Sequence, residues 1–299
     1  MPLILDGKAA AAAIRGKLQQ EVQLLAEQGL RPPHLAAILV GNDGASETYV
    51  FAKKKACDAA GFFSSVIRLP ETISEAELLE EIQAINNNPD IDGLIVQLPL
   101  PAHISERAVM DAIAPEKDVD GFHDRNIGKL AKGNPDFIPA TPLGILLLLQ
   151  HFGMETTGKH CVVVGRSNIV GRPLSILLSL PDKTGNATVT LCHSKTRDLA
   201  THTRSADILV AALGRPRFVT ADMVKPGAVV VDVGITRVDA PELKSGYRLL
   251  GDVDFDAVSP LVEAITPVPG GVGPMTIAGL LMNTMKARKL QIQHQSKLA

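Results

Sequence analysis

The stretch CVVVGRSNIVGRP, residues 161–173, decides the fold of this chain. Its four leading apolar residues are typical of a buried strand, and the glycines that follow predict a tight turn and the start of a helix. In a strand–turn–helix unit of this kind, unpaired N–H groups at the start of the helix are expected to point at a ligand, and the helix dipole favours negative charge there. The stretch therefore predicts a phosphate-binding turn.

The turn departs from the dinucleotide-binding fingerprint G-x-G-x-x-G at its second and third glycines. Ser167 replaces the second glycine, and the next glycine is Gly171. A purely structural interpretation, in which Gly165 and Gly171 only turn the chain between a strand and a helix, stays open at this point.

The next predicted strand, residues 187–192, ends without the acidic residue that usually holds the ribose 2′-hydroxyl of NAD. The segment HSKTR, residues 193–197, follows instead, and Arg166 is expected beside it. Cations and hydroxyls are therefore predicted where the 2′-phosphate of NADP would lie, which favours NADP over NAD. The alternative is that Lys195 and Arg197 are ordinary solvated surface charges.

The composition is that of a large globular protein. The chain has 299 residues, of which 45% are hydrophobic, which is enough for a large core and two domains. Its net charge of −2 gives no electrostatic footprint for nucleic acid or an anionic membrane surface. No uncharged apolar run reaches the about 18 residues that a membrane span needs. Nucleic acid and membranes are therefore not expected as partners.

Cysteine usage and the N-terminal stretch both favour a cytoplasmic protein. Cys57, Cys161 and Cys192 are widely spaced and lie in apolar or helical contexts, so we expect reduced core residues. The stretch MPLILDGKAAAAAIRGKL, residues 1–18, predicts a helix and not a signal peptide, because no charged region precedes an apolar one. Since the chain has no CxxC, HExxH or EF-hand pattern, no metal site is expected.

Short apolar strands alternate with helices along the chain, which is typical of an α/β fold with parallel sheets. We expect two α/β domains flanking a cleft, of which the second is a Rossmann-type NADP-binding domain. The terminal helix is expected to pack back on the first domain. The predicted domains are therefore residues 1–139 plus 270–299 and residues 140–269, with the boundary near Pro139 in a stretch rich in proline and glycine.

No internal repeat is evident in the sequence. The apolar pattern predicts helices over residues 9–28, 47–60, 75–86, 143–152 and 275–289. It predicts one series of parallel strands over 35–40, 65–69 and 93–97, and a second series over 161–164, 187–191, 208–211, 229–233 and 248–251.

One predicted helix carries the first candidate for chemistry. In SETYVFAKKKACDAAG, residues 46–61, Ser46 is a typical N-cap and Gly61 a typical C-terminal stop. At about 100° per residue, Tyr49 and Lys53 fall on the apolar stripe, whereas the other two lysines of the run fall away and are expected on the solvated surface. Since burial lowers the pKa of a lysine, Lys53 is the candidate general acid/base, and Tyr49 could stack on an aromatic ligand.

Polar side chains next to two further segments are candidates for a site. Gln97 follows the apolar run 92–96, and ligands of parallel sheets gather beyond the carboxyl ends of strands, so its amide could hold an amine. A loop glutamine facing water is the alternative. In PEKDVDGFH, residues 115–123, either Asp118 or Asp120 could accept hydrogen bonds from a ring with several N–H donors. The histidine of this loop is expected to be structural.

Five ordered motifs resemble the bifunctional methylenetetrahydrofolate dehydrogenase/cyclohydrolase family, the FolD type. The resemblance extends over essentially the whole chain. The motifs are the Tyr49-to-Lys53 spacing, DGLIVQLPLP (92–101), KDVDG (117–121), GRSNIVGRP (165–173) and PGGVGPMT (269–276).

This resemblance implies an enzyme of one-carbon metabolism with two activities. An NADP-dependent oxidation would convert 5,10-methylenetetrahydrofolate to the methenyl form, and a hydrolysis would convert that to 10-formyltetrahydrofolate. It implies that Lys53 is the acid/base residue of the hydrolytic step and that Gln97 hydrogen-bonds and tunes it. It also implies that Tyr49 stacks on the folate and that Asp120 grips the pterin ring.

The resemblance further implies which residues contact the cofactor and how the chain assembles. A homodimer is typical of the family, and Phe51, which falls off the apolar stripe of its helix, hints at an additional contact surface. NADP contacts are implied for Gly165, Arg166, Ser167, Ser194 and Ile235, with Arg166 and Ser194 near the 2′-phosphate, and Gly273 and Pro274 would border the folate.

Three other interpretations compete with this one. Short-chain dehydrogenases also use a Tyr-x-x-x-Lys pair, but there the pair follows the nucleotide turn, whereas Tyr49 and Lys53 precede Gly165 by more than a hundred residues. An NAD-linked dehydrogenase without cyclohydrolase activity is opposed by Lys53 with Gln97 and by the basic stretch after the second strand. A regulatory protein that only senses NADP would not need Lys53, Gln97 and Asp120.

Overall fold

The structure is a computed structural model that describes residues 1–42, 44–243 and 246–298, and it divides into two compact units. The six-stranded unit comprises Met1–Ala11 and Thr141–Thr276, and the three-stranded unit comprises Ala12–Ala140 and Ile277–Ala299. Two helices, α1 (Gly7–Glu27) and α10 (Val272–Leu298), have residues in both units.

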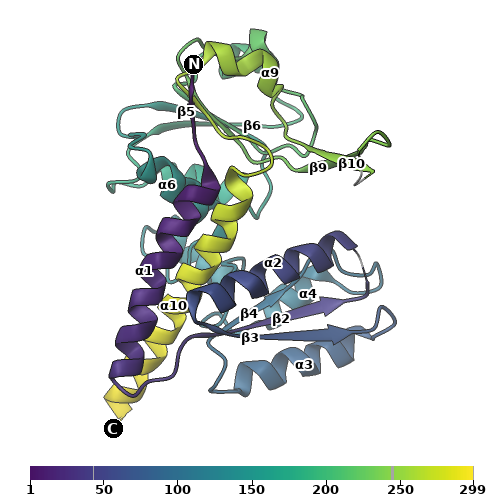
Figure 1. Cartoon of the computed structure of the whole chain (residues 1–299), viewed down its shortest axis with the longest axis vertical. Coiled ribbons are helices and arrows are strands. Elements are labelled where there is room, and N and C mark those ends of the chain that lie inside the picture. The colour runs from purple at the N-terminus through teal and green to yellow at the C-terminus, as the bar shows by residue number, and fades with distance from the viewer. Residues whose placement is uncertain (43, 244–245, 299) are drawn as a thin grey trace. The chain divides into compact units, whose positions relative to one another are not determined.

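The three-stranded unit is a parallel sheet in the order β3-β2-β4 with helices on both faces. Figure 1 shows α2 and α3 on opposite faces of this sheet. Two shorter helices follow β4. The elements are β2 (His34–Val40), α2 (Gly44–Ala60), β3 (Phe63–Leu69), α3 (Glu75–Asn87), β4 (Gly93–Val96), α4 (Glu106–Ala112) and α5 (Asp124–Ala131).

The central strand β2 is buried on both faces. Its residues Leu35, Ala37 and Leu39 join one apolar cluster with residues of α1, α2 and α10, and the alternate residues Ala36 and Ile38 join a second cluster with residues of α3 and α4. Successive side chains of a strand point to opposite faces, so a strand covered on both sides must be apolar throughout. This explains why the sequence HLAAILV shows no alternation.

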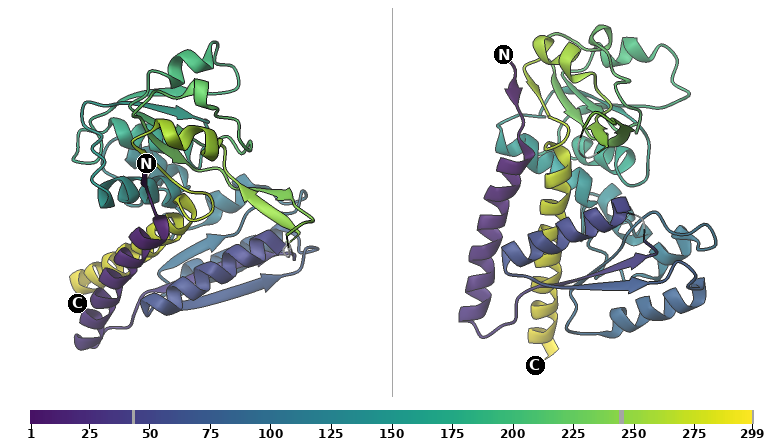
Figure 2. Two further views of the ribbon diagram at one scale, coloured as in Figure 1. Left: turned by 45° about the horizontal axis from the view of Figure 1, so that its top comes forward. Right: turned by 45° about the vertical axis from the view of Figure 1, so that its right-hand side comes forward.

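Within the three-stranded unit, α1 and α10 lie side by side, as Figures 1 and 2 show. Leu18 and Leu25 of α1 pack in the same cluster as Leu281 of α10. An ion pair of 2.6 Å between Lys289 Nζ and Glu21 Oε2 joins their exposed sides. The expected packing of the terminal helix on the first domain therefore holds for residues 277 onwards.

The six-stranded unit is a parallel sheet in the order β1-β11-β8-β7-β5-β6. Four helices and two short 3₁₀ turns connect its strands. The strands are β1 (Leu3–Ile4), β5 (His160–Val164), β6 (Thr188–Cys192), β7 (Ile208–Ala211), β8 (Val229–Asp232) and β11 (Ala264–Ile265). The connections include α6 (Ala140–His151), α7 (Gly171–Ser179), α8 (Leu199–Thr203), α9 (Phe255–Val258) and the turns Ala221–Met223 and Ser259–Leu261.

The prediction that residues 248–251 belong to the parallel series is wrong. This segment is β10 (Tyr247–Leu250), which pairs with β9 (Thr236–Asp239) as an antiparallel two-stranded sheet apart from the six-stranded one (Figure 2). The guanidinium of Arg237 stacks 3.8 Å from the ring centroid of Tyr247. Charged residues alternate along β9, and β10 carries Arg248, so these strands do not fit a sheet that helices cover on both faces.

The division of the structure differs from the expected domains in residues 1–11 and 270–276, which belong to the six-stranded unit. The N-terminal strand β1 extends the sheet, because the N–H groups of Leu3 and Leu5 donate to the carbonyls of Glu263 and Ile265 at 2.8 and 2.9 Å. Two residues of apolar sequence are too short for a strand to be recognised from pattern alone.

Ser46 lies inside α2 rather than at its N-cap, since the helix begins at Gly44. The expected C-terminal stop is confirmed. Gly61 has a φ of +77°, and its N–H donates to the carbonyl of Asp58, while the N–H of Phe62 donates to that of Cys57.

The three-stranded unit has a polar clamp at the amino end of its central strand. Asp92 accepts a hydrogen bond of 2.8 Å from the backbone N–H of His34, the first residue of β2. The imidazole of His34 lies 3.0 Å from the carbonyl oxygen of Asp90 and 2.8 Å from Ser65 Oγ.

The six-stranded unit repeats this clamp. Asp207 accepts a hydrogen bond of 2.8 Å from the N–H of His160, the first residue of β5. The imidazole of His160 lies 3.1 Å from the carbonyl oxygen of Ser205 and 2.9 Å from Thr190 Oγ1. The residues fill matching positions in both units, so the structure contains a repeat that the sequence did not show.

All three cysteines, Cys57, Cys161 and Cys192, are free and buried, as predicted. Burial raises the pKa of the Cys57 and Cys161 thiols to about 12, so neither is a reactive thiolate at neutral pH. Among the helices of the described residues, none combines the length and the apolar character that crossing a membrane requires.

Candidate functional site

Lys53 lies in the middle of α2 with only 6% of its surface exposed. Its Nζ donates a hydrogen bond of 3.1 Å to Gln97 Oε1 and lies 5.3 Å from the ring centroid of Tyr49, one helical turn earlier. The neighbouring Lys54 and Lys55 are exposed. The structure thus confirms that Lys53 alone of the three lysines is on the buried face.

Burial lowers the pKa of Lys53, and the negative charge of Asp120 opposes this shift. Burial also raises the pKa of Asp120, which the Lys53 charge lowers and the Asp118 charge raises. A buried amine and a buried carboxyl therefore act on each other, and each is displaced toward neutrality. Such a pair can hold or move a proton at physiological pH.

Two hydrogen bonds to backbone carbonyls fix the position of Gln97. It follows β4 directly, at the carboxyl end of the sheet, and its N–H donates to the carbonyl of Ile38 at 2.9 Å. Its side-chain Nε2 donates to the carbonyl of Leu98 at 2.8 Å. Because the amide nitrogen is used in this way, the amide oxygen faces Lys53 and fixes the position of the ammonium. The alternative of a glutamine facing water is wrong.

The structure separates the two aspartates between which the sequence did not choose. Asp118 is 2% exposed, and its carboxylate accepts hydrogen bonds from backbone N–H groups of the loop, so it is structural. Asp120 is the one that acts on Lys53. His123 is structural as expected, since its Nδ1 accepts a hydrogen bond of 3.0 Å from the N–H of Arg125 and caps α5.

The turn after β5 requires glycine at both ends. Gly165 has a φ of +122°, and a Cβ on it would lie 2.0 Å from the carbonyl oxygen of Ala212. A Cβ on Gly171 would lie 1.9 Å from the carbonyl oxygen of Gly165. These are contacts that no side chain can make, so the glycines allow three backbone segments to meet.

The helix that follows this turn does not offer the free N–H groups that the sequence predicted. Ser167 takes up the donors of the first turn of α7, because its Oγ and its carbonyl accept hydrogen bonds from Gly171 and Arg172 at 3.4 and 3.1 Å. The third residue of the helix is Pro173, which has no N–H. The prediction of free donors at the helix start is therefore wrong.

The free donors lie one step earlier, in the exposed turn itself. Within the described part of the chain, the backbone N–H groups of residues 166–169 donate no hydrogen bond. Four consecutive N–H groups of exposed residues are therefore available to a phosphate. Ser167, which departs from the fingerprint glycine, is the residue that moves this donor surface from the helix to the turn.

The loop after β6 begins with the segment HSKTR, residues 193–197, which contains no carboxylate. Its backbone is folded by Thr196 Oγ1, which accepts the N–H of His193 at 2.9 Å, and by the imidazole of His193, which accepts the N–H of Lys195 at 3.1 Å. Ser194 and Arg166 are exposed, and no hydrogen bond joins them in the described residues. Hydroxyl and cationic groups are thus available for a 2′-phosphate, so the residues present fit NADP.

Ile235 and Gly273 come together in the six-stranded unit. A Cβ on Gly273 would lie 3.4 Å from Ile235 Cδ1, and both residues line a small pocket with the segment 267–272. Ile235 is 47% exposed, and Pro274 is partly exposed at the start of α10. Ile235, for which the resemblance implies a contact with NADP, therefore lies next to Gly273, which the resemblance places at the folate.

Two buried carboxylates at the carboxyl end of the six-stranded sheet escaped the sequence analysis. Asp252 is fully buried and accepts N–H groups of Leu213, Gly214 and Arg215, in the loop after β7, at 2.5–3.0 Å. Asp232, the last residue of β8, accepts the N–H groups of residues 234, 252 and 253. An aspartate directly after the apolar run of β8 was the signal that could have located this pair.

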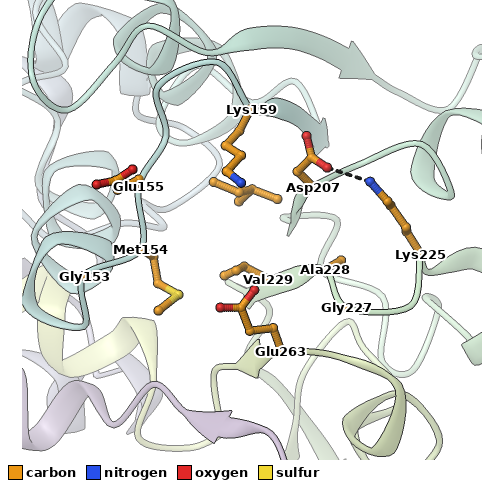
Figure 3. Close-up of a pocket in the computed structure, with 11 residues that line it drawn as sticks. Gly153, Met154, Glu155, Lys159, Asp207, Lys225, Gly227, Ala228, Val229 and Glu263 are labelled. Carbon is orange, nitrogen blue, oxygen red and sulfur yellow. Dashed lines mark hydrogen bonds and ion pairs between the residues drawn. The ribbon is translucent and has the colours of Figure 1, made fainter.

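A separate pocket lies at the opposite, amino-terminal edge of the same sheet (Figure 3). It is lined by residues that directly precede strands, such as Lys159, Asp207 and Glu263, and the ion pair of 2.6 Å between Asp207 and Lys225 lies at its side. None of the predicted site residues lines it. Since ligands of parallel sheets gather at the carboxyl ends of the strands, the candidate site is at the other edge.

Two family models match the chain. Residues 5–120 match the tetrahydrofolate dehydrogenase/cyclohydrolase catalytic domain, and residues 139–292 match the NAD(P)-binding domain of the same family. The chain belongs to the tetrahydrofolate dehydrogenase/cyclohydrolase family. Tyr49, Lys53, Gln97 and Asp120 lie within the catalytic-domain match, and the phosphate-binding turn lies within the NAD(P)-binding match.

Relatives of known name in this family cover nearly the whole chain. A bifunctional protein FolD from Cytophaga hutchinsonii is 57% identical over 96% of this chain and 99% of its own length. The crystal structure of the FolD enzyme of Campylobacter jejuni is 46% identical with a TM-score of 0.90, covering 97% of this chain and 99% of that one. FolD of Trypanosoma brucei, solved with NADP and an inhibitor, is 40% identical with a TM-score of 0.92, covering 98% and 99%.

Gly165→Ala is expected to weaken NADP binding at least tenfold, because the methyl group would displace the loop at Ala212 and with it the exposed N–H groups of the turn. Titration of NADPH fluorescence would measure this. Gly158→Ala is the matched control, since Gly158 also has a positive φ, of +72°, but its Cβ would meet nothing within 4 Å. Equal affinity in the two variants would contradict the assignment of the turn.

Asp232 is expected to make stability depend on pH. Burial raises its pKa from 3.8 to about 6. Because the folded-state pKa lies above the unfolded one, this stabilising contribution is full below the unfolded pKa and is lost as the pH rises through about 6. Between about pH 4.5 and 7 the loss is about 2 kcal/mol of unfolding free energy.

Urea unfolding of the Asp232→Asn variant at the two ends of this range would measure the contribution. The variant should lack that part of the pH dependence, whereas a control Asp256→Asn change at an exposed aspartate should retain it. An identical pH dependence in all three proteins would show that Asp232 is not the titrating group.

Proposed function

We propose that this chain oxidises 5,10-methylenetetrahydrofolate with NADP and hydrolyses the resulting 5,10-methenyltetrahydrofolate to 10-formyltetrahydrofolate. The observation that carries the proposal is the buried Lys53 amine, which Gln97 holds at 3.1 Å and whose pKa is lowered by burial. A dehydrogenase alone has no need of a dehydrated amine, because hydride transfer requires positioning rather than a protonating group. The lysine therefore favours the bifunctional enzyme over an NAD-linked dehydrogenase without cyclohydrolase activity.

NADP would be held by the turn after β5 and the loop after β6. The exposed N–H groups of residues 166–169 and the Ser167 hydroxyl would bind phosphate, and Arg166 and Ser194 would bind the 2′-phosphate. Ile235 would contact the cofactor from β8's carboxyl end. When bound, NADP supplies the acceptor for the hydride from the methylene carbon. The NADP complex of the 40% identical relative from Trypanosoma brucei supports this choice of cofactor.

The hydrolytic step would use Lys53 as its acid/base residue. Water attacks the methenyl carbon of the substrate, the new C–O bond forms, and the neutral amine of Lys53 takes up the proton that the water loses. The bond from that carbon to N5 then breaks as N5 receives the proton held by Lys53 and the new hydroxyl loses its own proton to solvent, which leaves the formyl group on N10. Gln97 keeps Nζ in place through its amide oxygen, and burial lowers the pKa of the amine, which favours its neutral form.

Tyr49 and Asp120 would orient the folate. The ring of Tyr49, which already lies over the Lys53 ammonium, would stack on the substrate, and the Asp120 carboxyl would pair with N–H donors of the pterin. Gly273 and Pro274 would border the folate, since both are small or rigid residues that leave room for a ring. These assignments carry the family's site residues to the matching positions of this chain.

We further propose that the enzyme is a cytoplasmic homodimer in which Phe51 contributes to a contact surface. Phe51 exposes 68% of its surface although it lies on a helix whose opposite face is buried. A large aromatic side chain in water is a typical component of a protein interface. The free, buried state of the three cysteines fits a reducing compartment.

The direct test of the function is the absorbance of NADPH. Mixing the protein with 5,10-methylenetetrahydrofolate and NADP should give NADPH, and 10-formyltetrahydrofolate should accumulate at a rate above that of spontaneous methenyl hydrolysis. A folded sample that binds NADP but forms no NADPH would instead indicate a protein that senses the cofactor.

Lys53→Met is expected to lower the cyclohydrolase rate at least about 100-fold, because the variant lacks the amine that takes the proton from water, while dehydrogenase turnover changes less than about tenfold. Separate assays of methenyl disappearance and NADPH formation would measure the two rates. Lys54→Met is the matched control at an exposed lysine paired with Asp58, and both rates should be unchanged. Equal loss of both activities in folded Lys53→Met enzyme would refute the division of labour.

A further inference from the structure

We propose that Asp118 and Asn126 are positioning residues that fix the carboxyl of Asp120 relative to Lys53, and so set both folate binding and the proton transfer of the hydrolytic step. The inference rests on the proposed function and extends it to two residues that would not touch the substrate. The hydrogen bonds of the loop 117–126 support the inference. The whole loop lies in the three-stranded unit.

The carboxylate of Asp118 organises the loop that carries Asp120. Its Oδ1 accepts the backbone N–H groups of Gly121 and Phe122 at 3.1 and 3.2 Å, and its Oδ2 accepts the N–H of His123 at 2.8 Å. The three donors follow Asp120 directly in the chain. A buried carboxylate that binds three successive N–H groups holds the peptide after Asp120 in one orientation.

The side-chain amide of Asn126 donates to Asp118 while its own oxygen stays without a hydrogen-bond partner. It is fully buried, and its Nδ2 donates to Asp118 Oδ2 at 2.8 Å and to the carbonyl of Pro115 at 3.0 Å. Its Oδ1 is the only buried side-chain nitrogen or oxygen of the described residues without a hydrogen-bond partner. An orphaned buried acceptor costs about 1–3 kcal/mol. The amide tolerates this cost while both of its N–H groups serve the loop.

The backbone around Asp120 is held on its other sides as well. The carbonyl of Asp120 accepts the N–H of Ala140 at 3.1 Å, and the carbonyl of Val119 accepts Asn283 Nδ2 at 2.8 Å. Gly121 has a φ of +77°, and a Cβ there would lie 2.7 Å from the backbone nitrogen of Pro139. With both flanking peptides fixed, only the side-chain torsions of Asp120 remain free.

Asp118 also acts on Asp120 through its charge. The groups that act electrostatically on the Asp120 carboxyl are Lys53, which lowers its pKa, and Asp118, which raises it, in addition to burial. Removing the Asp118 charge therefore favours ionised Asp120. An ionised Asp120 in turn stabilises the ammonium form of Lys53, because its charge raises the pKa of that amine.

The test is Asp118→Asn in the full-length enzyme. An amide can accept the N–H groups of Gly121 and Phe122, but its NH₂ would face the N–H of His123 and Asn126 Nδ2, which are also donors. We expect the KM for 5,10-methylenetetrahydrofolate to rise about tenfold or more, and the acid limb of the cyclohydrolase pH profile to move to higher pH. The affinity for NADPH should be unchanged, because the residues proposed to bind the cofactor lie in the six-stranded unit.

Two further variants make the test specific. Asp124→Asn changes an exposed aspartate two residues before Asn126 and should leave KM and the pH profile as in the native enzyme. The double variant Asp118→Asn/Asn126→Asp exchanges the amide and the carboxylate, which restores a donor–acceptor pair between the two positions. It should recover part of the lost folate affinity relative to Asp118→Asn alone.

The outcomes separate this inference from the proposed function. A native enzyme without either activity would overturn the proposed function. If the native enzyme has both activities, then an Asp118→Asn enzyme with native KM and pH profile overturns the positioning role. Should Asp118→Asn fail to fold by circular dichroism, Asn126→Ala takes its place, with the same rise in KM and the same displaced pH profile expected. If Asn126→Ala loses activity only in proportion to its folded fraction, with KM and the pH profile unchanged, the positioning role is overturned.

Discussion

The burial of one amine is the constraint on which the proposed chemistry depends. Lys53 is buried on the inner face of α2. A buried lysine is tolerated there because Gln97 accepts a hydrogen bond from its Nζ and Asp120 acts on it with an opposite charge. The helix, the end of β4 and the loop before α5 each contribute one member of this set. The parallel sheet brings them together, since its helices start and its loops turn where its strands end.

The two units use one device to make those edges rigid. In each, an aspartate accepts a hydrogen bond from a histidine that begins a strand, β2 in the three-stranded unit and β5 in the six-stranded unit, and this fixes the amino end of that strand. Loops at the carboxyl ends are held by buried carboxylates, Asp118 in one unit and Asp252 in the other, which accept successive backbone N–H groups. Rigid edges matter because binding and catalysis depend on the orientation of groups that the loops carry.

Most elements of both sheets could be predicted from apolar runs, because strands covered on both faces must be apolar along their whole length. The elements that were missed are those that such a pattern cannot describe. β1 and β11 have only two residues each, and β9 pairs with β10 in a separate antiparallel sheet. The histidine–aspartate repeat was also invisible, because it resides in a few polar contacts between segments far apart in the chain rather than in any sequence similarity.

The sequence by itself determined the α/β class, the glycine turn, the family and the selection of Lys53 among three lysines, since helical periodicity alone assigns a residue to a face. The spacing of residues left Asp118 and Asp120 open, and the resemblance alone selected Asp120. Only the tertiary structure showed that Asp118 binds backbone N–H groups while Asp120 acts on Lys53, and that the free N–H donors lie in the turn before α7. Those decisions depend on which donors meet which acceptors. Such pairings are made by segments that the fold brings together, and no local pattern of residue types specifies them.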